Sequence, residues 1–155
     1  MRNVLVTGGA GYCGSILVPD LLNKGYNVRV IDTLFFGNPF LKINSNKLEV
    51  IKGDIRDLEI VKTSMIGIDT VIHLACISND ASFELDENLS KTINFDAFEP
   101  LVQISKQNGV SRFLYVSSSS VYGVSDKRDV KEDHPLVPLT LYNKFKGLCE
   151  PILLK

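Results

Sequence analysis

The stretch VLVTGGAGYCG, residues 4–14, constrains the fold of this chain more than any other part of it. A run of apolar, mostly β-branched residues leads into Gly8, Gly11 and Gly14, and a helical pattern of apolar residues follows over 11–24. Glycines at this spacing are weak evidence alone. Between a strand and a helix, however, they allow a tight turn, the close approach of a pyrophosphate and a phosphate charge at the helix N-terminus. The sequence therefore predicts a strand–turn–helix unit that binds a dinucleotide.

Short apolar runs recur along the chain, separated by segments with helical spacing or turn residues. The predicted strands are 3–7, 27–31, 48–52, 70–74 and 112–117. Strands that alternate with helices indicate βαβ units, and hence a doubly wound α/β fold around a parallel sheet.

Two later segments carry helical patterns that a proline interrupts. The longest helical candidate is 88–107, and we expect Pro100 to divide or kink it because proline removes a helical hydrogen bond. For the same reason we expect Pro151 to disturb the helix that contains Tyr142.

Composition limits the classes of protein and of partner. The chain has 155 residues, 45% of them apolar, which is enough for one packed core. A net charge of −1 gives no indication of nucleic-acid or anionic-membrane binding. Cys13, Cys76 and Cys149 are too widely spaced for a metal site or a disulfide framework. No apolar stretch approaches transmembrane length, so we expect a soluble, cytoplasmic protein.

Asp32 directly follows the apolar run of the second predicted strand, 18 residues after Gly14. A carboxylate at this place can accept hydrogen bonds from both ribose hydroxyls of an adenosine, and it would repel a 2′-phosphate. Residues 33–37 contain no arginine or lysine to offset that repulsion. This pattern favours NAD over NADP, although Asp32 could instead be a solvated loop acid.

Tyr142 and Lys146 are four residues apart, so on a helix they share a face. This spacing is common, and by itself it indicates only surface residues. Beside a dinucleotide site it gains meaning, because an ammonium group and a positive nicotinamide ring would favour the ionised form of a phenol whose ordinary pKa is about 10. Such a tyrosine could act as a general base.

Seven elements occur in one order along the chain: TGGAGYCG, Asp32, GDIRD, HLAC, Asn94, SSSSVYG and YNKFK. Together they resemble the extended short-chain dehydrogenase/reductase family, and within it the NAD-dependent sugar-nucleotide epimerase/dehydratase group. The resemblance covers residues 7–146 and implies a Rossmann sheet in the strand order 3-2-1-4-5. It also implies that residues 1–155 form the NAD-binding domain, truncated after the Tyr142 helix, with the C-terminal substrate lobe absent.

The same resemblance implies roles for individual residues. The expected catalytic residues are Ser118, Tyr142 and Lys146, and Ser118 and Ser119 are expected to contact the substrate. The expected cofactor-binding residues are Gly8, Gly11, Tyr12, Cys13, Gly14, Asp32, Asp54, Ile55, Leu74, Ala75, Cys76, Asn94, Tyr142 and Lys146. No metal site is implied. Leu74 and Ala75 could simply be core residues and Asp54 a turn acid, and His73 is better interpreted as a packed residue at a strand end.

The four serines at 117–120 help to choose among reactions. Ser119 and Ser120 occupy positions at which the 4,6-dehydratases resemble one another in carrying an aspartate and a glutamate. Water elimination needs an acid and a base, which two serines hardly supply. The sequence therefore favours an NAD-dependent nucleotide-sugar epimerase, incomplete as this chain. The alternatives are a nucleotide-sugar reductase or dehydrogenase, and a non-catalytic NAD-binding fragment or partner subunit. The expected partners are a nucleotide sugar and a second copy of the chain, bound through the Tyr142 helix.

Overall fold

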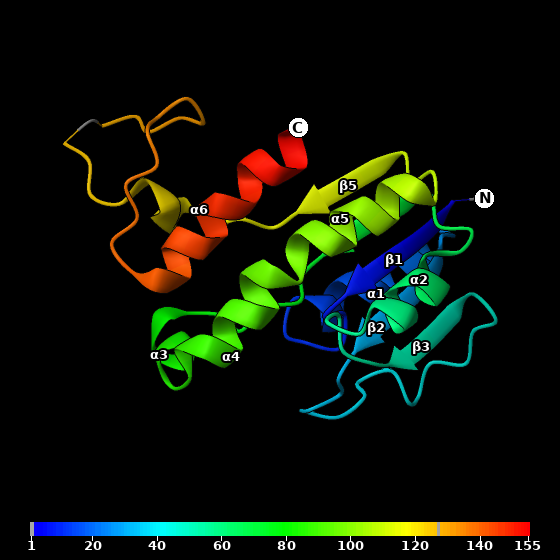
Figure 1. Cartoon of the computed structure of the whole chain (residues 1–155). Coiled ribbons are helices and arrows are strands. Elements are labelled where there is room, and N and C mark those ends of the chain that lie inside the picture. Colours follow the sequence, from blue (N-terminus) through cyan, green and yellow to red (C-terminus); the bar gives the residue numbers. More distant parts are fainter. Residues whose placement is uncertain (1, 127) are drawn as a thin grey trace. The chain divides into compact units, whose positions relative to one another are not determined.

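The computed structural model of the chain describes residues 2–126 and 128–155 and contains two compact units (Figure 1). Unit 1 comprises the chain up to Cys76 together with Pro100–Val116. Unit 2 comprises Ile77–Glu99 and Ser117–Lys155.

Unit 1 contains a parallel sheet of five strands. Its strands are β1 (Asn3–Thr7), β2 (Asn27–Asp32), β3 (Leu48–Lys52), β4 (Thr70–His73) and β5 (Arg112–Tyr115). Their order is β3-β2-β1-β4-β5, which confirms both the predicted fold class and the predicted strand order. The predicted strand boundaries were less accurate, because β2 includes Asp32, β4 ends at His73 and β5 ends at Tyr115.

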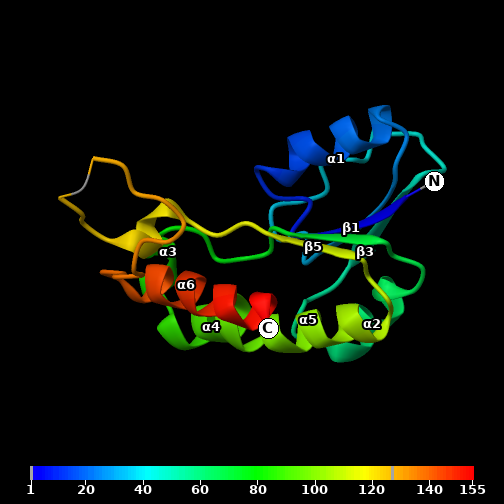
Figure 2. The ribbon, with the colours of Figure 1, turned by 90° about the horizontal axis from the view of Figure 1, so that it is seen from above.

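Helices cover both faces of this sheet, which explains why the middle of its central strand, residues 4–6, is entirely apolar. Figure 2 shows α1 (Gly14–Asn23) on one face, and α2 (Leu58–Met65) and α5 (Phe98–Gln107) on the other. Val4 and Val6 of β1 share a buried cluster with Val18 of α1. Leu5, between those two valines, is fully buried as well. A strand buried on both faces is typical of a parallel sheet.

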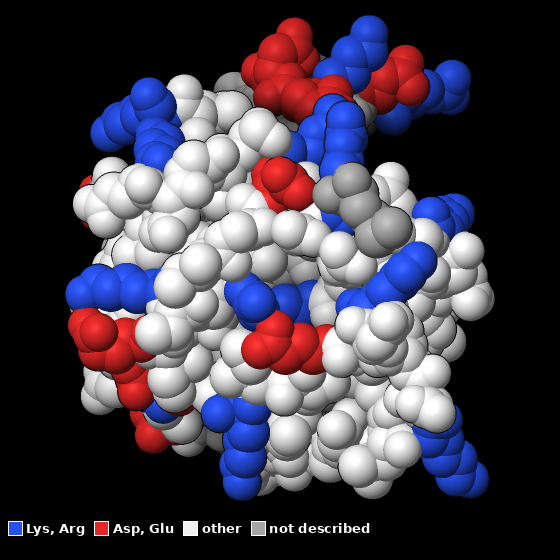
Figure 3. All heavy atoms as spheres, turned by 90° about the vertical axis from the view of Figure 1, so that its right-hand side faces the viewer, with Lys and Arg blue, Asp and Glu red and all other residues white. Residues whose placement is uncertain are grey.

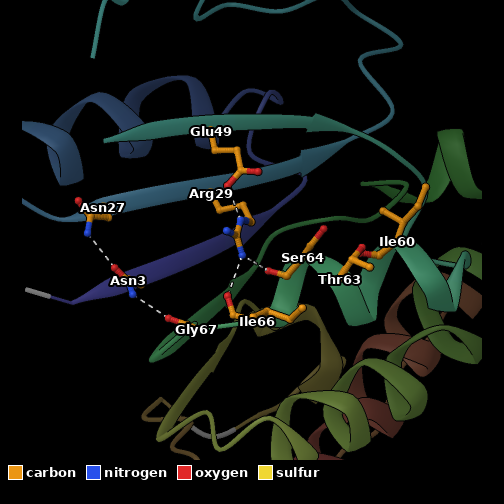
Figure 4. A network of polar contacts seen from close by, with 9 residues as sticks. All are labelled: Asn3, Asn27, Arg29, Glu49, Ile60, Thr63, Ser64, Ile66 and Gly67. Atoms are coloured by element: carbon orange, nitrogen blue, oxygen red, sulfur yellow. Dashed lines mark hydrogen bonds and ion pairs between the residues drawn. The ribbon is translucent and has the colours of Figure 1, made fainter. Parts of the chain in front are cut away.

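Side chains satisfy the backbone groups at both ends of α2. The Asp57 carboxylate accepts hydrogen bonds from two N–H groups of the first turn. At the other end Arg29 of β2 donates to the carbonyls of Ser64 and Ile66 and pairs with Glu49 of β3 at 2.6 Å (Figure 4). A cation at the C-terminus also complements the helix dipole. This network fixes α2 to the strands beneath it.

The predicted helix 88–107 is divided, as expected, but the break lies before Pro100. The segment comprises α4 (Glu87–Lys91), a π-helical turn η1 (Thr92–Asp96) and α5. Pro100 has no N–H to donate to the carbonyl of Asp96, and its ring would clash with that carbonyl in a regular helix. The preceding turn is widened instead, and the Ala97 N–H donates to the carbonyl of Thr92. Pro100 then lies in the first turn of α5, where no N–H is needed.

Unit 2 is built from α3 (Asp80–Glu84), α4, η1, a 3₁₀ turn η2 (Ser119–Tyr122) and α6 (Leu141–Leu154). Aromatic rings form much of its core: Phe145 lies 5.8 Å from Phe83 and 5.3 Å from Phe95, measured between ring centroids. The expectation that Pro151 would disturb α6 was wrong in one respect, since the helix continues through Pro151 to Leu154.

Candidate functional site

The glycine turn after β1 needs glycine for steric reasons. Gly8 has a φ of +68°, and a Cβ there would lie 2.6 Å from the backbone N and Cα of Ala75. A Cβ on Gly14 would lie 2.1 Å from the carbonyl oxygen of Gly9. At Gly11 the nearest atom would be 3.3 Å away, so the constraint there is weaker. The turn therefore packs closely against backbone atoms at Gly8 and Gly14, and a side chain would not fit at either position.

The start of α1 is suited to an anion. Its N-cap residue, Cys13, is exposed and makes no capping hydrogen bond through its side chain, and the first turn contains no acidic residue. Tyr12 is exposed as well. The first N–H groups of a helix carry a partial positive charge, and here they lack a side-chain partner. This is the arrangement that accepts phosphate oxygens in dinucleotide sites.

Asp32 lies at the end of β2 and bridges two loops. Its Oδ2 accepts a hydrogen bond from the Ala10 N–H at 3.0 Å, and its Oδ1 accepts one from the Leu34 N–H at 2.8 Å. The second bond supports Leu34 at a φ of +56°, which is unusual for a residue other than glycine. Each carboxylate oxygen has two lone pairs, so both keep one for a further donor. Asp32 is therefore held in place and still able to bind two hydroxyls.

Asp54 and Ile55 follow β3. The Arg56 guanidinium hydrogen-bonds to the Asp54 carboxylate, with Nη2 and Oδ2 2.6 Å apart, and lowers the pKa of Asp54 below its ordinary value. Ile55 is buried. Sequence reasoning overlooked Arg56, although its place two residues after Asp54 within GDIRD was a usable signal.

Residues 74–76 continue from β4 beside the glycine turn. The Leu74 N–H donates to the Thr7 carbonyl at 3.0 Å, and Leu74 also packs against the buried cluster under α1. Ala75 is the residue that Gly8 approaches, and Cys76 is partly buried. His73 is buried, with its Nδ1 2.7 Å from the Thr7 hydroxyl and its ring stacked on Tyr115, which supports its interpretation as a packed residue.

The predicted cofactor residues of unit 1 thus gather at one edge of the sheet. The glycine turn follows β1, Asp32 ends β2, Asp54 follows β3 and residues 74–76 follow β4. Because the strands are parallel, these are all carboxyl ends, and β1 and β4 are neighbours across which the strand order reverses. Ligands of open α/β sheets bind at this place.

The serine run belongs to unit 2 and contacts α6. The Ser118 and Ser120 hydroxyl oxygens are 2.5 Å apart. Ser120 donates to Oδ1 of Asn143 at 2.5 Å, and Asn143 is buried. Ser117 donates to Oε1 of Glu150, also at 2.5 Å. Neither α6 partner was predicted, since no spacing in the sequence connects these residues to the serines.

Tyr142 and Lys146 both lie on α6, at the predicted i and i+4 positions. Lys146 is buried, with only 6% of the residue exposed. Lysine is rarely buried without a polar or charged partner. The Tyr142 ring is partly buried and meets Phe83 edge-on at 6.3 Å. Ser119, predicted to contact the substrate, is exposed.

Asn94 lies in the π-helical turn of unit 2 and holds the backbone of Ile77. Its Oδ1 accepts from the Ile77 N–H at 2.8 Å, and its Nδ2 donates to the Ile77 carbonyl at 2.9 Å. Asn94 is 4% exposed. The structure thus shows this residue fixing the segment after β4, while its predicted contact with a cofactor stays a prediction.

The surface of the described residues, 2–126 and 128–155, carries charges of both signs. On the face shown in Figure 3, positive and negative side chains are interspersed among uncharged ones. Within those residues no helix is long and apolar enough to cross a membrane, and no three His, Cys, Asp or Glu side chains are grouped to hold a metal ion.

The chain is similar to proteins with three different activities. The family model described as "NAD dependent epimerase/dehydratase family" matches residues 4–154. A 3 beta-hydroxysteroid dehydrogenase/Delta 5-->4-isomerase of Mycobacterium tuberculosis is 34% identical over 99% of this chain and 42% of its own length. A UDP-glucose 4-epimerase of Lactobacillus helveticus is 32% identical over 97% of this chain and 46% of its own.

A solved structure supports the same comparison. The dTDP-glucose 4,6-dehydratase of Streptomyces venezuelae, solved with NAD bound, has a TM-score of 0.89 and 28% identity. The match covers 97% of this chain and 50% of that one. The chain therefore spans less than half the length of the curated relatives described above.

Proposed function

Because the chain belongs to the NAD dependent epimerase/dehydratase family, we propose that it forms the NAD-binding part of a nucleotide-sugar epimerase. The family is the one predicted from the sequence. Residues 1–155 would supply the cofactor site and the acid–base residues. The activity and substrate of the whole protein are part of this proposal, since the curated relatives are about twice as long.

The residues of unit 1 fit a dinucleotide. Gly8 and Gly14 allow a tight turn in which a Cβ at either position would overlap backbone atoms, and the first N–H groups of α1 have no side-chain cap. Asp32 is fixed by two backbone donors and keeps free lone pairs for the ribose hydroxyls. Its charge disfavours a 2′-phosphate. We expect the pyrophosphate and nicotinamide halves to be held by Gly11, Tyr12, Cys13 and residues 74–76, and the adenine by Asp54 and Ile55.

The residues of unit 2 supply the acid and the base. NAD, when bound, would supply the hydride acceptor that converts a sugar hydroxyl to a ketone and the hydride donor that reverses this. Tyr142 would take the proton of that hydroxyl and return it after the sugar has turned its other face. The Lys146 ammonium would stabilise the phenolate from one turn further along α6. Ser118 would hydrogen-bond the reacting hydroxyl.

One observation carries the choice of epimerase over dehydratase. Ser119 and Ser120 have no carboxyl group, and the Ser120 hydroxyl already donates to Asn143. Water elimination needs a group that removes a carbon-bound proton and a group that protonates the leaving hydroxyl. A serine whose proton is committed to a buried amide supplies neither. The serines therefore support a reaction that ends with the hydroxyl restored.

A second candidate is a dehydrogenase with net turnover of NAD. The 34% identity to a 3 beta-hydroxysteroid dehydrogenase over 99% of the chain favours it specifically. Such an enzyme uses the same proton and hydride transfers but releases the ketone. A non-catalytic NAD-binding fragment or partner subunit is the third alternative, and it would show binding without turnover.

Calorimetric titration of the chain with NAD tests the cofactor site, with Asp32→Ala as the variant expected to weaken binding. Incubation with NAD and candidate nucleotide sugars then tests the reaction. An epimerase produces a new sugar without net change in nicotinamide absorbance, whereas a dehydrogenase raises that absorbance. Tyr142→Phe should abolish turnover and Tyr26→Phe should not. Full turnover by Tyr142→Phe would refute the assigned base.

The proposed homodimer would use α6. Leu141 and Leu148, seven residues apart and hence on one face, are 37% and 41% exposed. Sedimentation equilibrium would test this association. We expect the mass of a dimer for the unsubstituted chain and a lower mass for Leu148→Ser, and the same mass for both proteins would count against a dimer through α6.

A further inference from the structure

Tyr142 lies in the first turn of α6, and the position of this turn depends on the cap of the helix. Thr140 is the N-cap residue, and its hydroxyl oxygen accepts a hydrogen bond from the Asn143 N–H at 3.3 Å. The first N–H groups of a helix have no partner within the helix, so a first turn that loses its cap is less stable. The proposed base therefore lies two residues after the side chain that caps its turn.

Asp80 of α3 holds this cap from outside α6. The Thr140 hydroxyl donates its one proton to Oδ1 of Asp80, 2.5 Å away. The bond joins residues that are 60 positions apart in the chain, and both residues are partly buried. Hydrogen bonds to an ionised carboxylate are stronger than those between neutral groups. Because its proton points toward Asp80, the Thr140 oxygen presents a lone pair to the Asn143 N–H.

The helix that carries Asp80 also contacts the ring of Tyr142. Asp80 and Phe83 are three residues apart on α3, so they are neighbours on its surface. Phe83 is fully buried, and its ring meets that of Tyr142 edge-on with centroids 6.3 Å apart. The Phe83 carbonyl accepts a hydrogen bond from the Ser90 hydroxyl of α4 at 3.0 Å, which fixes α3 within unit 2. One short helix thus contacts both the cap of α6 and the proposed base.

We infer that Asp80 is a positioning residue for Tyr142 and acts through the Thr140 cap. The inference deepens the proposed function and rests on it, because Tyr142 must be the residue that takes the proton of the reacting hydroxyl. Asp80 needs no contact with the substrate or with NAD for this role. Lys146 lies beyond the first turn of α6 and is buried, so loss of the cap would displace Tyr142 and leave Lys146 in place.

A displaced base slows proton transfer without weakening the binding of NAD. A misplacement of about 1 Å can cost about 100-fold in rate. Asp80→Ala removes the acceptor of the Thr140 proton, and the hydroxyl can then turn away from the Asn143 N–H. We expect kcat to fall on the order of tenfold to 100-fold, with the affinity for NAD unchanged.

The test compares Asp80→Ala with Asp80→Asn and Asp86→Ala. Asparagine keeps an Oδ1 that can accept the Thr140 proton, so Asp80→Asn should retain most of the wild-type kcat. Asp86 is a matched control because its carboxylate also caps a helix of unit 2, accepting from the Leu89 N–H at 2.9 Å at the start of α4. Asp86→Ala should lower stability through the loss of that cap and leave kcat unchanged. Turnover is expressed per NAD-binding site, counted by calorimetry, so that unfolded protein does not contribute.

Crystal structures of the three variants provide a readout that does not need turnover. We expect the Tyr142 ring to be displaced or in more than one position in Asp80→Ala, and in the wild-type position in the other two. A wild-type ring position or a wild-type kcat in Asp80→Ala would overturn the inference. An equal loss of kcat in Asp80→Asn or in Asp86→Ala would overturn it as well. A wild type without turnover would refute the proposed activity alone, and the crystal structures would still decide the positioning.

Discussion

Replacement of Gly8 by alanine tests the close approach of the glycine turn to the backbone of Ala75. The new Cβ would lie 2.6 Å from the backbone N and Cα of Ala75, where ordinary contacts are 3.4–4 Å. Those atoms cannot move away cheaply, because the preceding Leu74 N–H is bonded to the end of β1. Overpacking of this kind typically costs about 1–3 kcal/mol. The left-handed φ of +68° adds about 1–2 kcal/mol for any residue with a Cβ.

A matched control separates the two contributions. Gly109 has a φ of +74°, and a Cβ there would meet nothing within 4 Å. Gly109→Ala should therefore show the conformational cost without the overlap. For a chain of this size, an extra 1–3 kcal/mol lowers the melting temperature by roughly 2–12 °C. Thermal unfolding followed by circular dichroism should show this difference, and calorimetry should show weaker NAD binding by Gly8→Ala only. Equal melting temperatures for the two variants would refute the close approach.

Three further predictions use other parts of the structure. Ser64 is buried and its Oγ has no hydrogen-bond partner among the described residues, so Ser64→Ala should stabilise the protein by about 1 kcal/mol in urea unfolding; a clear loss of stability would contradict this. Because Arg56 lowers the pKa of Asp54, their bond contributes stability above about pH 4 and loses it as the pH falls through the lowered value. Arg56→Gln should thus cost less than about 1 kcal/mol at pH 7 and progressively less below pH 4, and a pH-independent cost would exclude the ion pair as its cause. Exposed Cys13 should be alkylated by iodoacetamide before buried Cys149, and NAD should slow the modification of Cys13; protection by an equal concentration of adenine alone would argue against a pyrophosphate at the turn.

Much of the fold was predictable because it depends on local patterns. Apolar runs bounded by turns placed all five strands, and strand–helix alternation predicted that they are parallel. The errors lie at strand ends, where burial no longer favours one residue over the next. The division of 88–107 was expected from Pro100. The widened turn at Thr92–Asp96 was not, because the sequence does not show how the backbone avoids the clash between the Pro100 ring and the Asp96 carbonyl.

In the candidate site, too, the features that follow from local spacing were predictable, and the long-range contacts were not. The positions of Tyr142 and Lys146 on one helix face followed from their spacing. The partners of the serines did not, because Asn143 and Glu150 are 23 and 33 residues away along the chain. Which donor meets which acceptor at that separation depends on how the chain folds back.

By itself the sequence determined the parallel sheet, the glycine turn, the acid at the end of β2 and the family, because each rests on residue type and short-range spacing. Only the tertiary structure decided that Gly8 touches the backbone of Ala75, that Asp32 is held by Ala10 and Leu34, and that Ser120 donates to Asn143. These contacts join segments far apart in the chain. Their geometry is set by the packing of strands and helices, which local propensity does not encode.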